Sequence, residues 1–171
     1  FEFNVSTRNL VGDIRWTTDF NIALNRNDVV DLASEESMPI PSRINQLDPG
    51  WLMVGKPIGL FYGLKTDGLF QSQEEIEESA QPGAKPGDIK YIDHNGDGVI
   101  NADDRQIIGK SEPKFFGGIM NTFSYKNINI SVFLQGTYGN DIWNGNLLSH
   151  EYPNGLYNQF TTVLDRWTPD N

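Results

Sequence analysis

The sequence predicts an all-β chain of antiparallel hairpins, interrupted by a long insert that carries short helices and an acidic loop. Three observations predict this class. Apolar and polar residues alternate with period two in several stretches, which is the pattern of strands with one apolar face. Aromatic residues make up 12% of the chain, and its 17 glycines and 9 prolines favour many turns. Between the alternating stretches, side-chain oxygens recur at every second position of one short segment.

The first predicted hairpin occupies residues 1–32. One face of its first strand is mainly apolar and the other is polar, up to a turn around Gly12. That apolar face holds Phe1, Phe3, Val5 and Thr7. The alternation then resumes, and the corresponding face of the second strand holds Trp16, Thr18, Phe20, Ile22 and Leu24. Two alternating stretches joined by a short turn predict an antiparallel hairpin.

Residues 33–114 form the predicted insert. Ser72, followed three residues later by a glutamate, is a capping-box pattern, so we expect a short acidic helix over 73–79. A second short helix is expected over 101–108, where a glycine follows. The insert also has apolar material for a small core. These side chains are Trp51, Phe61, Tyr62, Leu64, Leu69 and Phe70.

Within the insert, the acidic loop at 93–104 has its oxygens in the order of an EF-hand-type calcium loop. Side-chain oxygens at loop positions 1, 3 and 5, a backbone carbonyl at position 7 and a carboxylate at position 12 would surround one point. The candidate ligands are Asp93, Asn95, Asp97, the Val99 carbonyl and Asp104. Gly98 supplies the positive φ that a tight loop needs. Because a hard cation prefers about six to eight oxygens, the spacing predicts Ca²⁺ as the bound ion.

Position 12 of this loop departs from the general pattern, which ends in glutamate. Asp104 is one methylene shorter, so the loop must close more tightly to reach an ion. The loop is similar to those of dockerin modules, which also carry Asp there and often Asn at position 9, as Asn101 is here. A dockerin repeats its loop, and no repeat follows Gly109. The alternative is an acidic turn without an ion, since Asn-Gly and Asp-Gly are common turn formers.

The clearest alternation lies in the second predicted hairpin, at residues 115–138. Its first strand contains two glycines, and Lys126-Asn127 forms a short turn. One face of its second strand holds Ile128, Ile130, Val132, Leu134, Gly136 and Tyr138. A strand of about 10 alternating residues that ends in an aromatic suits a membrane-spanning β-strand. Strands of soluble sandwiches alternate too, so periodicity alone leaves both possibilities open.

The lengths of the connections favour a membrane barrel. The turns inside the two hairpins are short, whereas the insert at 33–114 is long. Outer-membrane barrels have short turns on the periplasmic side and long loops outside. We therefore expect residues 33–114, and residues 139–171 as the start of the next loop, to be extracellular.

Composition argues against several functions. A formal net charge of −10 argues against nucleic acid as a partner and suits a divalent cation. The chain has no cysteine, and hence no disulfide or thiolate metal site. Its two histidines, His94 and His150, stand in no nucleophile or zinc arrangement, and paired carboxylates such as Glu74-Glu75 read as solvated helix faces. We therefore predict that the protein is not an enzyme.

Ten short stretches resemble the SusC/RagA-type TonB-dependent outer-membrane transporters of Bacteroidetes. The similarity covers nearly the whole chain and is most specific from Gly87 to Asp141. The stretches are 55–70, 86–93, 95–100, 103–105, 108–109, 113–115, 117–118, 121–126, 133–141 and 166–171.

The resemblance implies a fragment from the C-terminal half of a large outer-membrane β-barrel, and we expect the sequence to be cut from a longer chain. Such transporters import oligosaccharides or peptides with a SusD-like surface lipoprotein, and the TonB complex supplies the energy. The plug and the TonB box would lie outside this sequence. The implied location is the cell outer membrane, in contact with its lipid, and the implied role is nutrient uptake. The alternative hypothesis is a soluble extracellular calcium-binding β module for adhesion or carbohydrate binding.

Overall fold

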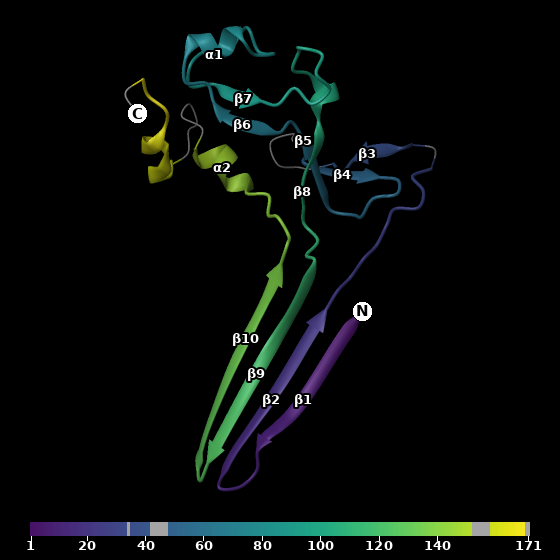
Figure 1. Ribbon diagram of the computed structural model, residues 1–171, viewed down its shortest axis with the longest axis vertical. Coiled ribbons are helices and arrows are strands. Elements are labelled where there is room, and N and C mark those ends of the chain that lie inside the picture. The colour runs from purple at the N-terminus through teal and green to yellow at the C-terminus, as the bar shows by residue number, and fades with distance from the viewer. Residues whose placement is uncertain (34, 42–47, 152–157, 170–171) are drawn as a thin grey trace. The chain divides into compact units, whose positions relative to one another are not determined.

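The computed structural model describes residues 1–33, 35–41, 48–151 and 158–169. The described part is mostly antiparallel strands with a few short helices, which confirms the all-β prediction (Figure 1). The strands are β1 (Glu2–Leu10), β2 (Ile14–Ala23), β3 (Ser37–Pro39), β4 (Gly50–Met53), β5 (Leu60–Gly63), β6 (Thr66–Leu69), β7 (Ile89–Tyr91), β8 (Gln106–Lys110), β9 (Phe115–Tyr125) and β10 (Ile128–Tyr138). The helices are α1 (Gln73–Glu77) and α2 (Gly145–His150), with 3-10 turns η1 (Ala102–Asp104) and η2 (Thr161–Asp165).

Two long hairpins join into one four-stranded sheet of order β1-β2-β9-β10. Both hairpins lie where the alternation predicts them, and their turn ends lie together (Figure 1). The join is the antiparallel pairing of β2 with β9, which runs from Ile14 opposite Tyr125 to Ala23 opposite Phe116. The insert therefore leaves at the end of β2 and returns to the strand beside it.

The register of this sheet gives it one apolar face and one polar face, because successive side chains of a strand point to opposite sides. Rows on the apolar face are Val5–Phe20–Ile119–Leu134, Phe3–Ile22–Gly117–Gly136 and Trp16–Phe123–Ile130. Polar rows on the other face are Thr17–Thr122–Ser131, Asn4–Asn21–Gly118–Gln135 and Arg15–Ser124–Asn129, and this face also carries Phe116 and the Met120–Phe133 pair. Both hairpins thus direct most of their apolar side chains to one face of the sheet and most of their polar side chains to the other.

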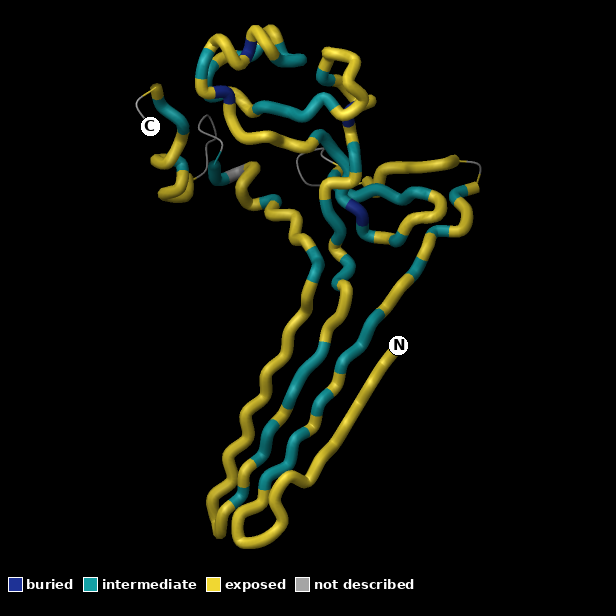
Figure 2. Tube along the Cα trace, in the orientation of Figure 1, coloured by how far each residue is buried: buried dark blue, intermediate teal, exposed yellow. Residues whose placement is uncertain are grey.

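Neither face of the four-stranded sheet is covered in this structure. Every residue of β1 and β10 is exposed, and β2 and β9 are at most half-buried (Figure 2). Leu134 is 63% exposed and Ile130 57%, although both are apolar. Contiguous apolar surface of this kind normally marks a binding or membrane surface rather than a finished protein exterior.

The chain divides into two compact units. The first consists of Phe1–Ser37, Leu52–Gly59 and Lys110–Asp141 and contains the four-stranded sheet. The second consists of Met38–Trp51, Leu60–Gly109 and Ile142–Asn171. The strands of the insert form two smaller sheets, in the orders β3-β4-β5-β8 and β6-β7. The domain boundaries drawn from the sequence at 32, 114 and 138 stay predictions.

The small core expected in the insert is present in part. Among the described residues, the buried hydrophobic side chains are Leu60, Phe70 and Ile76, all in the second unit. Trp51 packs against Tyr62 with ring centroids 4.9 Å apart. Leu69, which was expected in the core, is 37% exposed.

Of the two helices expected in the insert, one forms and the other does not. Ser72 caps α1 by accepting a 3.4 Å hydrogen bond from the Glu75 N–H, but the helix ends at Glu77 rather than Ser79. The prediction of a helix over 101–108 is wrong, because only the 3-10 turn η1 is helical there. Arg105 is already extended, with ψ at 139°, and residues 106–110 form strand β8. The β-branched Ile107 and Ile108 favour a strand, which explains the outcome.

None of the helices in the described part of the chain is both long and apolar enough to cross a membrane.

Candidate functional site

The acidic loop at 93–104 is curled by its own carboxylates. Asp93 accepts hydrogen bonds from the N–H groups of Gly96 at 2.7 Å and Gly98 at 2.8 Å. Both glycines have positive φ, 75° and 81°, a conformation that other residues adopt at a steric cost. The first predicted ligand therefore sits at the centre of a tight turn, where the sequence pattern places it.

The next oxygens follow in the predicted order. Asn95 accepts from the Asp97 N–H at 2.9 Å, and Asp97 accepts from the Val99 N–H at 2.9 Å. The Asn95 amide also donates to Asp97 at 3.0 Å. In each bond to a backbone N–H, the side-chain oxygen accepts from the residue two positions later, which closes a small turn of the chain. The Val99 carbonyl accepts a long 3.5 Å bond from the Asn101 side chain.

Asp104 closes the loop and is fully buried, with 0% of its surface exposed. Its carboxylate accepts from the N–H groups of Asn101 at 2.8 Å and His94 at 2.9 Å. The Asn101 N–H, with those of His94 and Asn95, holds the pKa of Asp104 below its usual range, although burial acts in the opposite direction. One short side chain thus ties both ends of the loop together in its ionised form.

The carboxylates of the loop are turned towards backbone N–H groups. Across the described residues, no three His, Cys, Asp or Glu side chains are gathered as metal ligands. The donors are all oxygen, which fits a hard cation such as Ca²⁺ and does not fit a thiolate or imidazole metal. The predicted ligand set of Asp93, Asn95, Asp97, Val99 and Asp104 stays a prediction.

A polar network interrupts the apolar face of the four-stranded sheet. Asn121 accepts from the Trp16 indole N–H at 3.0 Å and from the Thr18 hydroxyl at 2.7 Å. Thr18 in turn accepts from Asn9 at 2.7 Å, and Asn9 accepts from Thr7 at 2.9 Å. The network ties β1, β2 and β9 together and pairs polar groups that an apolar surrounding would otherwise leave unsatisfied. Sequence periodicity gave no signal for it, because its five members look like ordinary strand residues.

Aromatic pairs lie near both ends of the same apolar face. Trp16 stacks on Phe123 near the turn end, with centroids 5.4 Å apart. Phe115 stacks on Tyr138 at the opposite end, with centroids 5.2 Å apart. Stacked aromatic pairs at two levels of one mainly apolar face are typical of a membrane-facing sheet.

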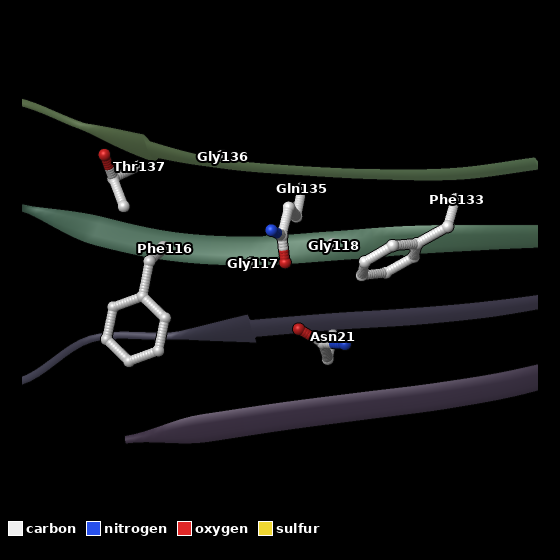
Figure 3. A pocket seen from close by; sticks show the side chains of 8 residues that line it. All are labelled: Asn21, Phe116, Gly117, Gly118, Phe133, Gln135, Gly136 and Thr137. Carbon is white, nitrogen blue, oxygen red and sulfur yellow. The ribbon is translucent and has the colours of Figure 1, made fainter.

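On the polar face, glycines open a hollow in the wall of the sheet (Figure 3). The hollow has a volume of about 500 Å³, and Asn21 and Gln135 lie over its glycine floor between the rings of Phe116 and Phe133. At Gly117 a Cβ would meet the backbone oxygen of Asn21. Of the two consecutive glycines that weaken the alternation of β9 in the sequence, Gly117 therefore allows the close approach of β2, whereas a Cβ at Gly118 would meet Phe133 and Leu134 of β10.

The chain is similar to TonB-dependent receptors of Bacteroidetes. TonB-dependent receptor P26 of Formosa agariphila is 34% identical over 174 residues, which cover 100% of this chain and 18% of that receptor. TonB-dependent receptor P3 of the same organism is 33% identical over 177 residues, again 100% of this chain and 18% of the relative. TonB-dependent receptor SusC of Bacteroides thetaiotaomicron is 22% identical, over 83% of this chain. No family model matches the chain.

These relatives identify the chain as a segment homologous to the TonB-dependent receptors. Within that class it is SusC-like, which confirms the resemblance drawn from its sequence motifs. The chain spans about a fifth of the length of these relatives, 18% for P26 and 14% for SusC.

Proposed function

We propose that this segment is part of the wall of an outer-membrane receptor that imports glycans or peptides, with its apolar face towards lipid and its polar face towards the pore. The observation that carries the proposal is the register of the four-stranded sheet. It places the apolar rows of both hairpins on one exposed face and the hydroxyl and amide rows on the other. A sheet with lipid on one side and water on the other needs this division.

The height of the apolar face supports this orientation. Between the two aromatic levels, from Phe115 to Phe123, β9 rises about 27 Å at about 3.4 Å per residue. A strand tilt of about 35–45° would reduce this to about 19–22 Å. Outer-membrane barrels have an apolar band about 25 Å tall between their aromatic girdles. The tilted height of about 19–22 Å expected for this face is close to that value.

The names of the relatives support a TonB-dependent receptor, and the remaining parts of the proposal follow from the resemblance to SusC-like transporters. A receptor of the TonB-dependent class resides in the outer membrane, and SusC-like members act with a SusD-like surface lipoprotein and the TonB complex. The TonB complex would be contacted through regions outside this sequence. Residues 33–114 and 139–171 would be extracellular, near that lipoprotein. The segment would have no catalytic role, and a soluble adhesion or carbohydrate-binding module is not favoured, because the relatives are named as receptors.

Lipid accessibility tests the orientation. Single spin or fluorescent labels at Ile130 and Val132, on the apolar face of β10, should be quenched by a lipid-soluble probe in the membrane-embedded full-length receptor. Labels at Ser131 and Gln135, on the polar face of the same strand, should be quenched by a water-soluble probe instead. The four sites differ in face but share one strand, so each pair controls for the other. Equal lipid quenching at all four would contradict a membrane wall.

We also propose that the loop at 93–104 binds Ca²⁺ and thereby stiffens the extracellular insert. The support is the order of its oxygens and the curled backbone, in which Asp93, Asn95 and Asp97 each accept a hydrogen bond from a following backbone N–H. Calcium at about 100 times its dissociation constant would add about 2.7 kcal/mol to the ordered loop. Asp97→Ala should abolish a calcium-dependent rise in melting temperature of the insert, and Asp67→Ala, outside the loop, should keep it. A calcium-dependent rise in melting temperature that persists in the Asp97→Ala variant would contradict the proposed calcium site.

A further inference from the structure

We propose that a cavity at the upper ends of β2 and β9 binds the phosphodiester headgroup of a membrane lipid. The inference rests on the proposed membrane orientation of the sheet and adds a specific lipid site to it. The cavity has a volume of about 560 Å³, and its lining residues belong to the first unit. Most of them follow the end of β2 or lie at the beginning of β9, whose positions Figure 1 shows.

Three of the chain's 13 basic side chains line this one cavity. They are Arg26, Lys110 and Lys114, of which Lys110 is half-buried and the other two are exposed. None of the three forms an ion pair; the one salt bridge found among the described residues joins Lys90 to Asp67. Three cations that share a cavity and form no ion pair within 4 Å with any described residue can donate charge-assisted hydrogen bonds to an anion.

The backbone fixes where these cations stand. Lys110 and Asp141 exchange two hydrogen bonds, from the Lys110 N–H to the Asp141 carboxylate at 2.9 Å and from the Asp141 N–H to the Lys110 carbonyl at 2.6 Å. The Lys114 N–H donates to the Tyr138 carbonyl at 2.8 Å, and its ammonium lies 5.9 Å from the centre of the Tyr138 ring. The backbone is therefore held by hydrogen bonds at Lys110, the last residue of β8, and at Lys114, the residue before β9.

Two carboxylates in the lining decide what kind of anion fits. Asp28 and Glu112 also line the cavity, so the formal charge of the lining is +1. Glu112 accepts a 2.8 Å hydrogen bond from the Asn27 side chain, whose oxygen accepts from the Ile58 N–H at 2.9 Å. In a chain of net charge −10, a lining of +1 is complementary to a singly charged phosphodiester rather than to a multiply charged phosphate.

The cavity is continuous with the apolar face, which points to a lipid as the source of the phosphate. Leu24 and Phe115 line it, and Phe115 belongs to the aromatic pair with Tyr138 at that end of the face. A lipid with its acyl chains along Phe20 and Ile119 would bring its headgroup to the level of Phe115. Basic side chains just beyond an aromatic level are placed to reach a lipid phosphate.

Native mass spectrometry of the full-length receptor, released from detergent with added lipids, tests the site. The probes are phosphatidylglycerol and a diglucosyl diacylglycerol with the same acyl chains and no phosphate. We expect the wild-type receptor to retain phosphatidylglycerol preferentially, and the Lys110→Ala, Lys114→Ala double variant to bind it about tenfold more weakly. Lys126→Ala is the matched control, because Lys126 lies over Tyr125 at the other end of the sheet, 5.2 Å from the ring centre.

A second variant separates the site from a structural role of the lysines. Glu112→Gln keeps an acceptor for Asn27 and raises the formal charge of the lining, so it should tighten phosphatidylglycerol binding. Equal retention of both lipids, or equal loss in Lys126→Ala, would overturn the proposal. Displacement of the lipid by millimolar sn-glycerol 3-phosphate would overturn the lipid assignment in favour of a soluble phosphate ligand. If the labels at Ile130 and Val132 meet lipid but phosphatidylglycerol is not retained, only this inference fails.

Discussion

At the scale of single residues, Asp104 is the carboxylate that closes the acidic loop. Its short carboxylate accepts from Asn101, which starts the turn η1, and reaches back to His94 at the opening of the loop. The residue that departs from the calcium-loop pattern is therefore the one that closes the loop through backbone contacts.

The lowered pKa of Asp104 predicts a pH dependence for the order of this loop. Because the folded pKa lies below the unfolded one, the unfolded chain takes up a proton first as the pH falls. The stabilisation is then fully present above about pH 4, near the ordinary aspartate pKa of about 3.9, and is lost as the pH falls through the lowered folded value. Amide exchange protection at His94 and Asn101, corrected for the intrinsic rate, measures it.

Asp104→Asn should weaken protection at His94 and Asn101 at neutral pH and flatten its decline in acid. Asp103→Asn changes the exposed neighbour and should leave the profile as in the wild type. A wild-type profile that is flat down to about pH 2 would contradict the role given to Asp104.

At the scale of elements, the close approach of β2 to β9 depends on a glycine. A side chain at Gly117 would meet the Asn21 carbonyl, whereas nothing lies within 4 Å of the Cβ position at Gly136, directly opposite on β10. Gly117→Ala should therefore destabilise the β2–β9 pairing by about 1–3 kcal/mol, the usual cost of overpacking. Gly136→Ala, on the outer strand of the described sheet, is the matched control and should be tolerated.

The folded fraction of the receptor in outer membranes, read from its heat-modifiable mobility on gels at increasing temperature, measures the two glycine variants. A lower transition temperature for Gly117→Ala alone is the expected result. Equal transition temperatures for both variants would mean that β2 and β9 can separate enough to admit a methyl group.

The sequence predicted the elements whose pattern is regular and missed those set by long-range contacts. Alternation located both hairpins, including the turn at Lys126, because period two directly reflects one apolar face. The pairing of β2 with β9 across the insert has no local signature and came only from the structure. The helix expected at 101–108 failed because the capping signal at Asn101 supports a single turn, while Ile107 and Ile108 pair in a sheet.

The candidate site was likewise predictable where its chemistry is local. The sequence alone shows the order of side-chain oxygens from Asp93 to Asp104. In the structure, hydrogen bonds from these oxygens to nearby backbone N–H groups curl the segment. The polar network around Asn121 joins residues more than 100 positions apart, and the basic cavity joins Arg26 to Lys110 across the insert. Such groupings appear only when the strands are placed side by side.

At the scale of the whole molecule, the four-stranded sheet is a partial structure. β1 and β10 each have one neighbour, so both present an unpaired edge in this segment. Its apolar face is exposed, and among the described residues the buried side chains all belong to the second unit. A sheet in this state needs further strands at its edges and an apolar surrounding on one face. Relatives about five times as long have room for those strands.

The row that contains Gly117 and Gly136 carries no side chains on two adjacent strands. Steric repulsion between neighbouring side chains is what resists the folding of a pleated sheet across its strands, so resistance is least along that row. A closed barrel needs bends in its strands, and the strands of this segment can bend most easily at this row. Curvature of the finished wall would then be concentrated at one level, close to its upper rim, rather than spread evenly along the strands.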